Sequence, residues 1–158
     1  MPKAYRRGGG RTVMNWRIGQ MEAQHEACLA IVEDIQARSQ HIADRPAAVE
    51  ITLMLARLTG ILRIHLALED EILYPALRNA PDPRIAEMAE RFWQEMGGLA
   101  DAFLDFVDRW KRADALLADA EGFRIESARV FKALADRIDH EHAEIYPMAE
   151  RLRSARAG

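Results

Sequence analysis

Residues 65–77, HLALEDEILYPAL, are the stretch that decides how this chain folds. Apolar residues recur at intervals of three and four through and around it, which is typical of an amphipathic α-helix. His65 and Glu69 lie one turn apart on the same stripe as Leu62 and Ile72. An ionised carboxylate that faces a helical core needs a partner. This helix is therefore predicted to carry a polar site on its inward face.

A second stretch repeats the pattern further along the chain. EHAEIYPMA, at residues 141–149, matches EDEILYPAL, at residues 69–77, in its glutamate, its isoleucine or leucine and its Tyr-Pro pair. Both prolines fall near predicted helix ends, where a proline kinks or ends a helix and frees a backbone carbonyl. The repeat thus has a structural reason. It indicates two related helical hairpins and is not by itself evidence of function.

The same periodicity appears in four long segments, and none shows the alternation of a β-strand. The breaker clusters HIADRP and NAPDPR separate the first three, and Gly122 precedes the last. Asp82 and Pro83 provide a cap and a first helical residue for the third. The expected helices span residues 14–40, 47–77, 83–117 and 123–153. Because their connections are short, the prediction is an all-α, up-and-down antiparallel four-helix bundle.

The domain organisation is expected to be simple. A chain of 158 residues with 49% hydrophobic content is the size of one ordinary domain and can bury a core. Residues 14–153 are predicted to form that bundle. Residues 1–13, MPKAYRRGGGRTV, are polar and glycine-rich, so we expect a disordered N-terminal arm. Residues 154–158 are expected to be a frayed C-terminus.

Composition argues against several classes of protein. The formal net charge of -3 is small and its charges are interspersed, which speaks against a nucleic-acid partner. The single cysteine, Cys28, permits no internal disulfide, zinc ribbon or iron–sulfur ligand set. No run of about 18 apolar residues indicates a membrane span, and residues 1–13 do not read as a secretory leader. We expect a cytoplasmic monomer or homodimer without a membrane partner.

Each predicted helix carries at least one residue of metal-ligand type on its inward stripe. These are His25 in the first, His65 and Glu69 in the second, Glu95 in the third and Glu141 in the fourth. With a rise of about 1.5 Å per residue, all five can lie within about one turn of the same height in the bundle. Two histidines and three carboxylates that converge between facing helices can bind a pair of iron or manganese ions.

Taken singly, these residues also have ordinary structural explanations. An inward histidine such as His25 is often a hydrogen-bonded core residue, and Glu95 alone fits a rim residue that reaches outward. Cys28, one turn from His25, is either a redox-sensitive thiol or a small buried hydrophobe. Only the coincidence of the stripes supports a metal site.

Other polar residues near the stripes leave their roles open. Arg137 lies four residues before Glu141 and either pairs with its carboxylate or is solvated. Tyr74 and Tyr146 either hydrogen-bond to the ligands or simply pack.

At residues 65–77 the chain resembles the hemerythrin family of HHE cation-binding domains. The shared signature is a histidine, a carboxylate four residues later, and a short acidic and apolar run that ends in Tyr-Pro. The resemblance covers residues 14–153. It implies a hemerythrin-like bundle in which His25, within QHEACLAIV, matches the histidine of helix one, and His65 and Glu69 match the pair of helix two.

The second half departs from the family pattern. Helix three usually contributes a histidine, but this one contains none, so Glu95 in QEMGGLADAF is the expected ligand. Helix four usually carries a histidine followed four or five residues later by a carboxylate, but Arg137 stands four residues before Glu141. Arginine does not ligate metals. Either Glu141 or His142 is then the helix-four ligand.

The resemblance and the ligand set together predict a non-haem centre with two iron ions, and manganese is an alternative metal. Such a centre reacts with or senses dioxygen, peroxide, nitric oxide or iron itself. We expect a binding or sensor protein rather than an enzyme. Two alternatives stay open: a ferroxidase or peroxidase of the kind that ferritin-like bundles provide, and a metal-free interaction bundle.

Overall fold

The structure is a computed structural model that describes the backbone of residues 9–155 and the side chains of residues 18–155. Its α-helices are α1 (Gly9–Ser39), α2 (Arg45–Leu68), α3 (Tyr74–Arg78), α4 (Pro83–Met96), α5 (Leu99–Trp110), α6 (Ala113–Ala118), α7 (Ala120–His140) and α8 (Tyr146–Ala155). Two π-helical segments are η1 (Glu69–Leu73) and η2 (Glu141–Ile145). Residues 9–155 contain no strand, so the prediction of an all-α fold is confirmed.

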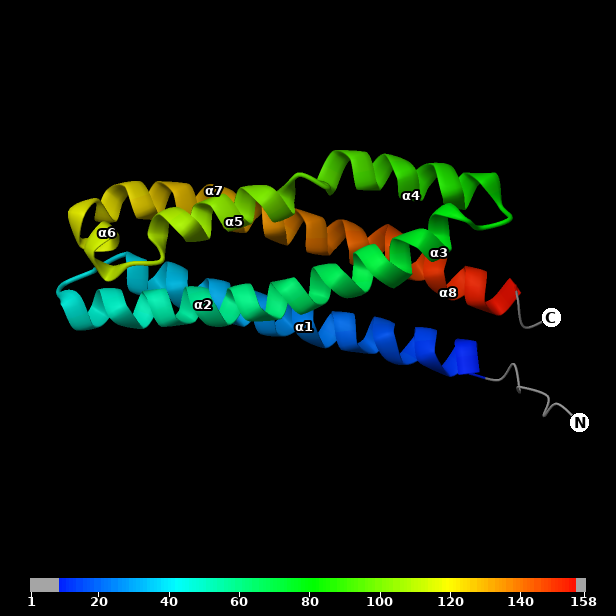
Figure 1. Ribbon diagram of the computed structural model, residues 1–158, viewed down its shortest axis with the longest axis horizontal. Helices are drawn as coiled ribbons and strands as arrows, with labels where there is room; N and C mark the ends of the chain where they lie inside the picture. The colour runs from blue at the N-terminus through cyan, green and yellow to red at the C-terminus, as the bar shows by residue number, and fades with distance from the viewer. Residues whose placement is uncertain (1–8, 156–158) are drawn as a thin grey trace, which may run out of the picture.

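The helices lie in four rows along the long axis of the molecule (Figure 1). One row is α1, the second is α2 with η1 and α3, the third is α4 with α5, and the fourth is α7 with η2 and α8. Successive rows run in opposite directions, and α6 joins α5 to α7 at the left end of the view (Figure 1). The expected third helix, residues 83–117, is not continuous but divided into α4, α5 and most of α6.

A pair of glycines explains the main break in the third row. Gly97 and Gly98 separate α4 from α5, and glycine is a poor residue for a helix interior. A Cβ atom added at Gly97 would lie only 2.7 Å from the carbonyl oxygen of Trp93. Because only glycine fits this close approach without a shift, the chain ends one helix here and starts the next at Leu99.

Other helix boundaries also differ from expectation. α1 begins at Gly9, earlier than the expected start at residue 14, and α8 continues to Ala155. Residues 9–13 of the predicted arm (1–13) and residues 154–155 of the predicted frayed end (154–158) are therefore helical, and the remaining residues of both segments lie outside the described residues. α7 begins at Ala120 rather than after Gly122, because the side chain of Asp119 accepts a hydrogen bond from the Gly122 N–H at 2.8 Å.

We expect the substitution Asp119→Ala to lower the free energy of unfolding by about 1 kcal/mol, because it removes the N-cap of α7. Chemical denaturation followed by circular dichroism measures this change. The matched control is Asp108→Ala, which removes an exposed carboxylate that pairs with the exposed Lys111 and should have little effect. Equal stabilities of the two variants would contradict the assignment of the cap.

The two π segments explain the repeat seen in the sequence. In η1 the N–H of Tyr74 bonds to the carbonyl of Glu69, five residues back, and in η2 Tyr146 bonds to Glu141 in the same way. The proline that follows each tyrosine has no N–H for the usual bond four residues back, so the wider turn is accommodated there. Each π segment begins at a glutamate. Such turns are frequent at functional sites.

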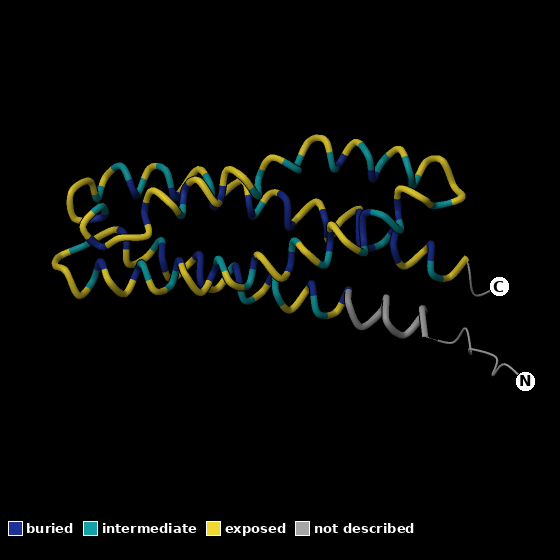
Figure 2. The backbone as a smooth tube through the Cα atoms, viewed as in Figure 1, coloured by how far each residue is buried: buried dark blue, intermediate teal, exposed yellow. Residues whose placement is uncertain are grey.

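Buried residues line the inward sides of the rows (Figure 2), and their apolar side chains form two clusters. One cluster joins α1, α2, α5, α6 and α7, and the other joins α1, η1, α3, α4, η2 and α8. A layer of buried polar side chains lies between them along the chain: His25, His65, Glu69, Arg137 and Glu141. The fold therefore encloses a layer of charged and polar side chains between two apolar clusters.

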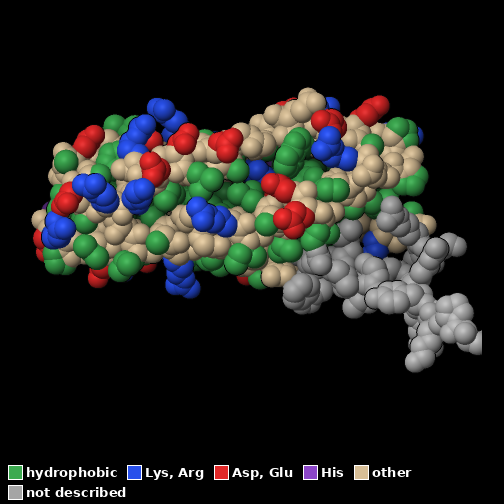
Figure 3. Space-filling view, in the orientation of Figure 1, with side chains coloured by type: hydrophobic (Ala, Val, Ile, Leu, Met, Phe, Trp, Pro, Cys, Tyr) green, Lys and Arg blue, Asp and Glu red, His purple; other side chains and the backbone are tan. Residues whose placement is uncertain are grey.

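The outer surface is mixed in character. On the face shown in Figure 3, basic and acidic side chains are interspersed with apolar ones. The stretch Arg45–Arg78 is long and apolar enough to cross a membrane by length and composition alone. A single such stretch is weak evidence, because core helices of bundles share this property. Its inward face carries the buried His65 and Glu69.

Candidate metal centre

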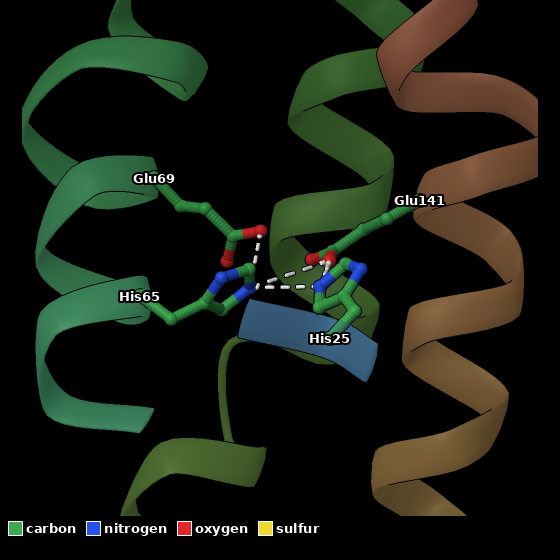
Figure 4. A group of neighbouring side chains, drawn as sticks. All are labelled: His25, His65, Glu69 and Glu141. Atoms are coloured by element: carbon green, nitrogen blue, oxygen red, sulfur yellow. Dashed lines mark hydrogen bonds and ion pairs between the residues drawn. The ribbon is translucent and has the colours of Figure 1, made fainter. Parts of the chain in front are cut away.

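Four side chains from three rows of the bundle meet in the buried polar layer (Figure 4). They are His25 of α1, His65 of α2, Glu69 at the start of η1 and Glu141 at the start of η2. Each offers one ligand atom, and these atoms all lie within 4.8 Å of one another. None of the four residues is more than 3% exposed. We call them the His/Glu cluster.

The spacing of the ligand atoms corresponds to a single ion. Nε2 of His65 lies 2.9 Å from Nε2 of His25 and 2.9 Å from Oε1 of Glu69. Oε2 of Glu141 lies 3.0 Å from Nε2 of His25 and 3.7 Å from Nε2 of His65. When bonds to one metal ion are about 2.0–2.2 Å long, neighbouring ligand atoms stand roughly 3 Å apart. The cluster fits a cation of this size.

Two oxygen atoms of the cluster are buried and unsatisfied. Oε1 of Glu69 and Oε2 of Glu141 have no hydrogen-bond partner of good geometry among the described residues. Leaving a buried carboxylate oxygen unpaired is costly. These are the same oxygens that approach the imidazole nitrogens, so one cation between them would satisfy both.

The other oxygen of each glutamate binds Arg137 of α7. Nη2 of Arg137 donates to Oε2 of Glu69 at 2.8 Å, and Nε donates to Oε1 of Glu141 at 2.8 Å. The hydroxyl of Tyr74 also donates to Oε1 of Glu141, at 3.3 Å. Arg137 is only 3% exposed. Of the two alternatives for Arg137, pairing with Glu141 is the one observed, and the guanidinium bridges both carboxylates.

The outer nitrogens of the imidazoles have partners too. Nδ1 of His65 lies 3.1 Å from Oε1 of Gln24, and because an amide oxygen only accepts, His65 carries its proton on Nδ1. Nδ1 of His25 lies 2.8 Å from Nε2 of His142. Such outer partners fix the ring orientation and the tautomer of metal-binding histidines. Both Nε2 atoms therefore face the centre of the cluster.

Burial and proximity shift the protonation of the cluster. Burial, with the charge of Glu141, raises the pKa of Glu69 to about 7. Burial opposes the charge of Glu141 as well, but the nearby imidazoles of His25 and His65 and the guanidinium of Arg137 hold its pKa well below the usual range. Burial lowers the pKa of His25. Burial also disfavours charged His65, but the nearby carboxylates of Glu141 and Glu69 outweigh this and raise the pKa of His65 to about 9. A metal ion competes with protons here.

Glu95 does not belong to the cluster. It is exposed on α4 and lines a separate pocket with His140 and Glu144. The buried face of α4 carries Ala89 and Phe92, and the helix ends at Met96. The expected inward position of Glu95 is not observed, because the buried stripe of α4 runs through Ala89, Phe92 and the half-buried Met96, and Glu95 lies one position off it.

His142 has a different position from Glu141. It is exposed, and it touches the outer nitrogen of His25 rather than the centre of the cluster. Of the two alternatives for the fourth helix, Glu141 is the residue that enters the cluster. Gln24, the partner of His65, was not among the residues predicted for the site. Its only signal is the position next to His25.

Cys28 behaves as a buried apolar residue. It is 0% exposed within the core cluster, and burial raises its pKa to about 12. We expect its thiol to react with DTNB at pH 8 roughly a thousandfold more slowly in the native protein than after unfolding in guanidinium, because the thiolate is the reacting form. Because Cys28 is the only cysteine, the absorbance is unambiguous. Rapid labelling of the folded protein would favour the redox-thiol alternative.

A small chamber borders the cluster. It offers about 20 Å³ to the centre of a water-sized sphere, which is enough for about one such molecule. The polar part of its wall comes from His25, His65, Arg137 and Glu141. The rest of the wall is apolar: Leu62, Leu66, Leu99, Ala100, Phe103, Leu134 and Ile138. The His/Glu cluster therefore adjoins a small space whose wall is mostly apolar.

Comparison with known families agrees with this geometry. The model of the hemerythrin HHE cation binding domain matches residues 17–149, which include the whole cluster. No curated protein and no solved structure shows significant similarity to the chain. The match covers most of the sequence, and the buried histidines and glutamates supply the ligands that a cation requires. The chain thus belongs to the hemerythrin family of HHE cation-binding domains.

Proposed function

We propose that the protein holds non-haem iron in the His/Glu cluster and uses it to react with or sense a small molecule such as dioxygen, nitric oxide or peroxide. The observation that carries this proposal is a set of four buried ligand atoms, spaced for one ion, beside a chamber of molecular size. Cation binding is the property of the family, and the choice of iron and of a small partner is the proposal.

The donor set suits iron. His25 and His65 would supply two imidazole nitrogens, and Glu69 and Glu141 two carboxylate oxygens. Imidazole is a good ligand for iron and zinc, whereas carboxylates favour harder ions such as manganese. Iron adds a change of oxidation state that zinc lacks. Four protein ligands leave room at the ion for a further ligand on the chamber side.

The chamber supports a small and weakly polar partner. Its apolar wall of leucine, isoleucine and phenylalanine side chains offers few hydrogen bonds to a polar substrate. Its size admits one molecule of about the volume of water. The guanidinium of Arg137, also in the wall, is placed to donate a hydrogen bond to an electronegative ligand.

Anaerobic titration with Fe(II) tests the proposal. Iron is expected to bind in whole-number stoichiometry, and nitric oxide should then produce a new electron paramagnetic resonance signal from the ferrous protein. Mn(II) and Zn(II), titrated in parallel, report whether the site prefers iron. Oxidation of many iron equivalents per chain would instead indicate a ferroxidase. Failure of the full-length protein to take up iron, with zinc taken up normally, would overturn the proposal.

The proportion of nitrogen to oxygen ligands also predicts which oxidation state of iron the site favours. The oxygen carriers of the family use a centre dominated by histidine nitrogen, whereas the His/Glu cluster contains equal numbers of nitrogen and oxygen donors. Anionic oxygen ligands stabilise Fe(III) relative to Fe(II). After anaerobic reduction, exposure to air should therefore give a ferric spectrum directly. A visible band that forms with dioxygen and vanishes reversibly on its removal would contradict this prediction.

A further inference from the structure

The guanidinium of Arg137 occupies the centre of the bundle beside the His/Glu cluster. It forms short hydrogen bonds to one oxygen of Glu69 and one oxygen of Glu141, each at 2.8 Å. The remaining oxygen of each glutamate is the unsatisfied one that faces the imidazoles. Each carboxylate therefore turns one oxygen toward the predicted ion and one toward a positive charge that belongs to the protein.

This arrangement conflicts with a second ion at the same carboxylates. A carboxylate that bridges two cations gives one oxygen to each of them. In this chain the second oxygen of Glu69 and that of Glu141 already accept from Arg137, and the latter also accepts from Tyr74. Among the described residues, no other set of three or more His, Cys, Asp and Glu side chains has this spacing.

The net charge of the buried residues also argues against a second ion. With neutral histidines, Glu69, Glu141 and Arg137 together carry one negative charge, and a single divalent ion leaves one positive charge. Two divalent ions would leave three positive charges in a region where every side chain is at most 3% exposed. Repulsion of this kind is strong where water does not screen it. The charge balance therefore favours one divalent ion in the His/Glu cluster.

The backbone holds the guanidinium in place. Nη1 of Arg137 donates to the carbonyl oxygen of Met96 at 3.2 Å. Met96 is the last residue of α4, where carbonyls lack partners within the helix and the helix dipole favours a cation. The break at Gly97 thus ends α4 where its carbonyl meets Arg137. The guanidinium connects the second, third and fourth rows of the bundle.

From these contacts we infer that Arg137 takes the place of a second metal ion, so that the centre binds one ion per chain instead of the two that the sequence analysis predicted. This inference rests on the proposed function for the presence of a metal, but not for the identity of the metal or the reaction. Arg137 is a positioning residue: it holds the two carboxylates with one oxygen each turned inward.

The first test is the metal stoichiometry of the full-length protein. Anaerobic equilibrium dialysis against Fe(II), and separately against Zn(II), with elemental analysis per chain, should saturate at one ion. Saturation at two ions in the wild-type protein would overturn the inference. Uptake of one zinc but no iron would overturn the proposed function and leave the inference standing, whereas uptake of neither metal would overturn both.

The second test removes the guanidinium. Arg137→His supplies a nitrogen ligand in its place and should raise the saturation to two ions per chain. Arg137→Lys keeps the positive charge and serves as the matched control, with saturation at one ion. A folded Arg137→His protein that still binds one ion, or an Arg137→Lys protein that binds two, would overturn the inference. Circular dichroism establishes that each variant is folded.

If Arg137→His does not fold, Arg137→Glu provides a second variant, refolded with Zn(II) present. Its added carboxylate offsets the charge of a second ion, so it should also saturate at two ions. A folded Arg137→Glu protein that saturates at one ion would overturn the inference. The wild-type stoichiometry decides the question independently of either variant.

Discussion

The variant His65→Ala is expected to lose about nine tenths or more of the metal that the parent protein binds. His65 supplies a nitrogen that lies 2.9 Å from both Nε2 of His25 and Oε1 of Glu69. Removal of an outer partner of a metal ligand already costs about 10–100-fold in affinity, and removal of the ligand itself costs more. Elemental analysis after dialysis against a fixed concentration of Fe(II) measures the loss.

Two controls make this result specific. His41 is exposed in the connection after α1, so His41→Ala should keep the full metal content. Glu95→Ala should also keep it, because Glu95 is exposed on α4 and lies outside the cluster. If His65→Ala binds as much metal as the parent protein, the assignment of the metal site to the His/Glu cluster is contradicted. Loss of metal in Glu95→Ala would restore that residue as a ligand.

The second large effect is on stability: the metal-bound protein should melt about 5–10 °C above the metal-free form. Glu69 and Glu141 are each 0% exposed and each leave one oxygen unsatisfied, so a cation improves only the folded state. Metal at about 100 times its Kd stabilises a protein by about 2.7 kcal/mol. For a chain of this length, each kcal/mol raises Tm by about 2–4 °C. Differential scanning calorimetry with EDTA or with metal measures the difference.

The control for this experiment is His65→Ala, in which added metal should no longer raise Tm. If the wild-type protein melts at the same temperature with metal and with EDTA, the buried cluster does not bind the ion. Arg137 moderates the effect, since its guanidinium keeps both carboxylates paired when metal is absent. The metal-free protein is therefore expected to stay folded at room temperature.

Much of the site was accessible from the sequence because each ligand interrupts an otherwise apolar stripe. His25, His65, Glu69 and Glu141 all replace apolar residues at positions that helical periodicity turns inward, and all four are buried. The repeated Tyr-Pro pair also proved informative. Each copy follows a π segment that opens with a glutamate of the cluster. Periodicity within one helix is a local property, so one sequence suffices to detect it.

The error at Glu95 shows where this reasoning fails. The inward stripe of α4 runs through the buried Ala89 and Phe92 and the half-buried Met96, so Glu95, one position earlier than Met96, lies off it on the exposed side. This helix has apolar residues at positions 85, 88, 89, 92, 93 and 96, so its sequence allows more than one inward stripe. Packing against the other rows decides which of these stripes is buried.

The sequence by itself determined the all-α class, the family and the residues that line the inward faces, because propensity, periodicity and motif spacing are local. Only the tertiary structure decided what those residues do together. The contact between Arg137 and Glu69 spans 68 positions, and that between Gln24 and His65 spans 41. Hydrogen bonds over such separations depend on how each helix is rotated about its axis and where it ends. Because of that geometry, the guanidinium of Arg137 lies against both carboxylates, in the place that we assign to a second metal ion in a two-ion centre.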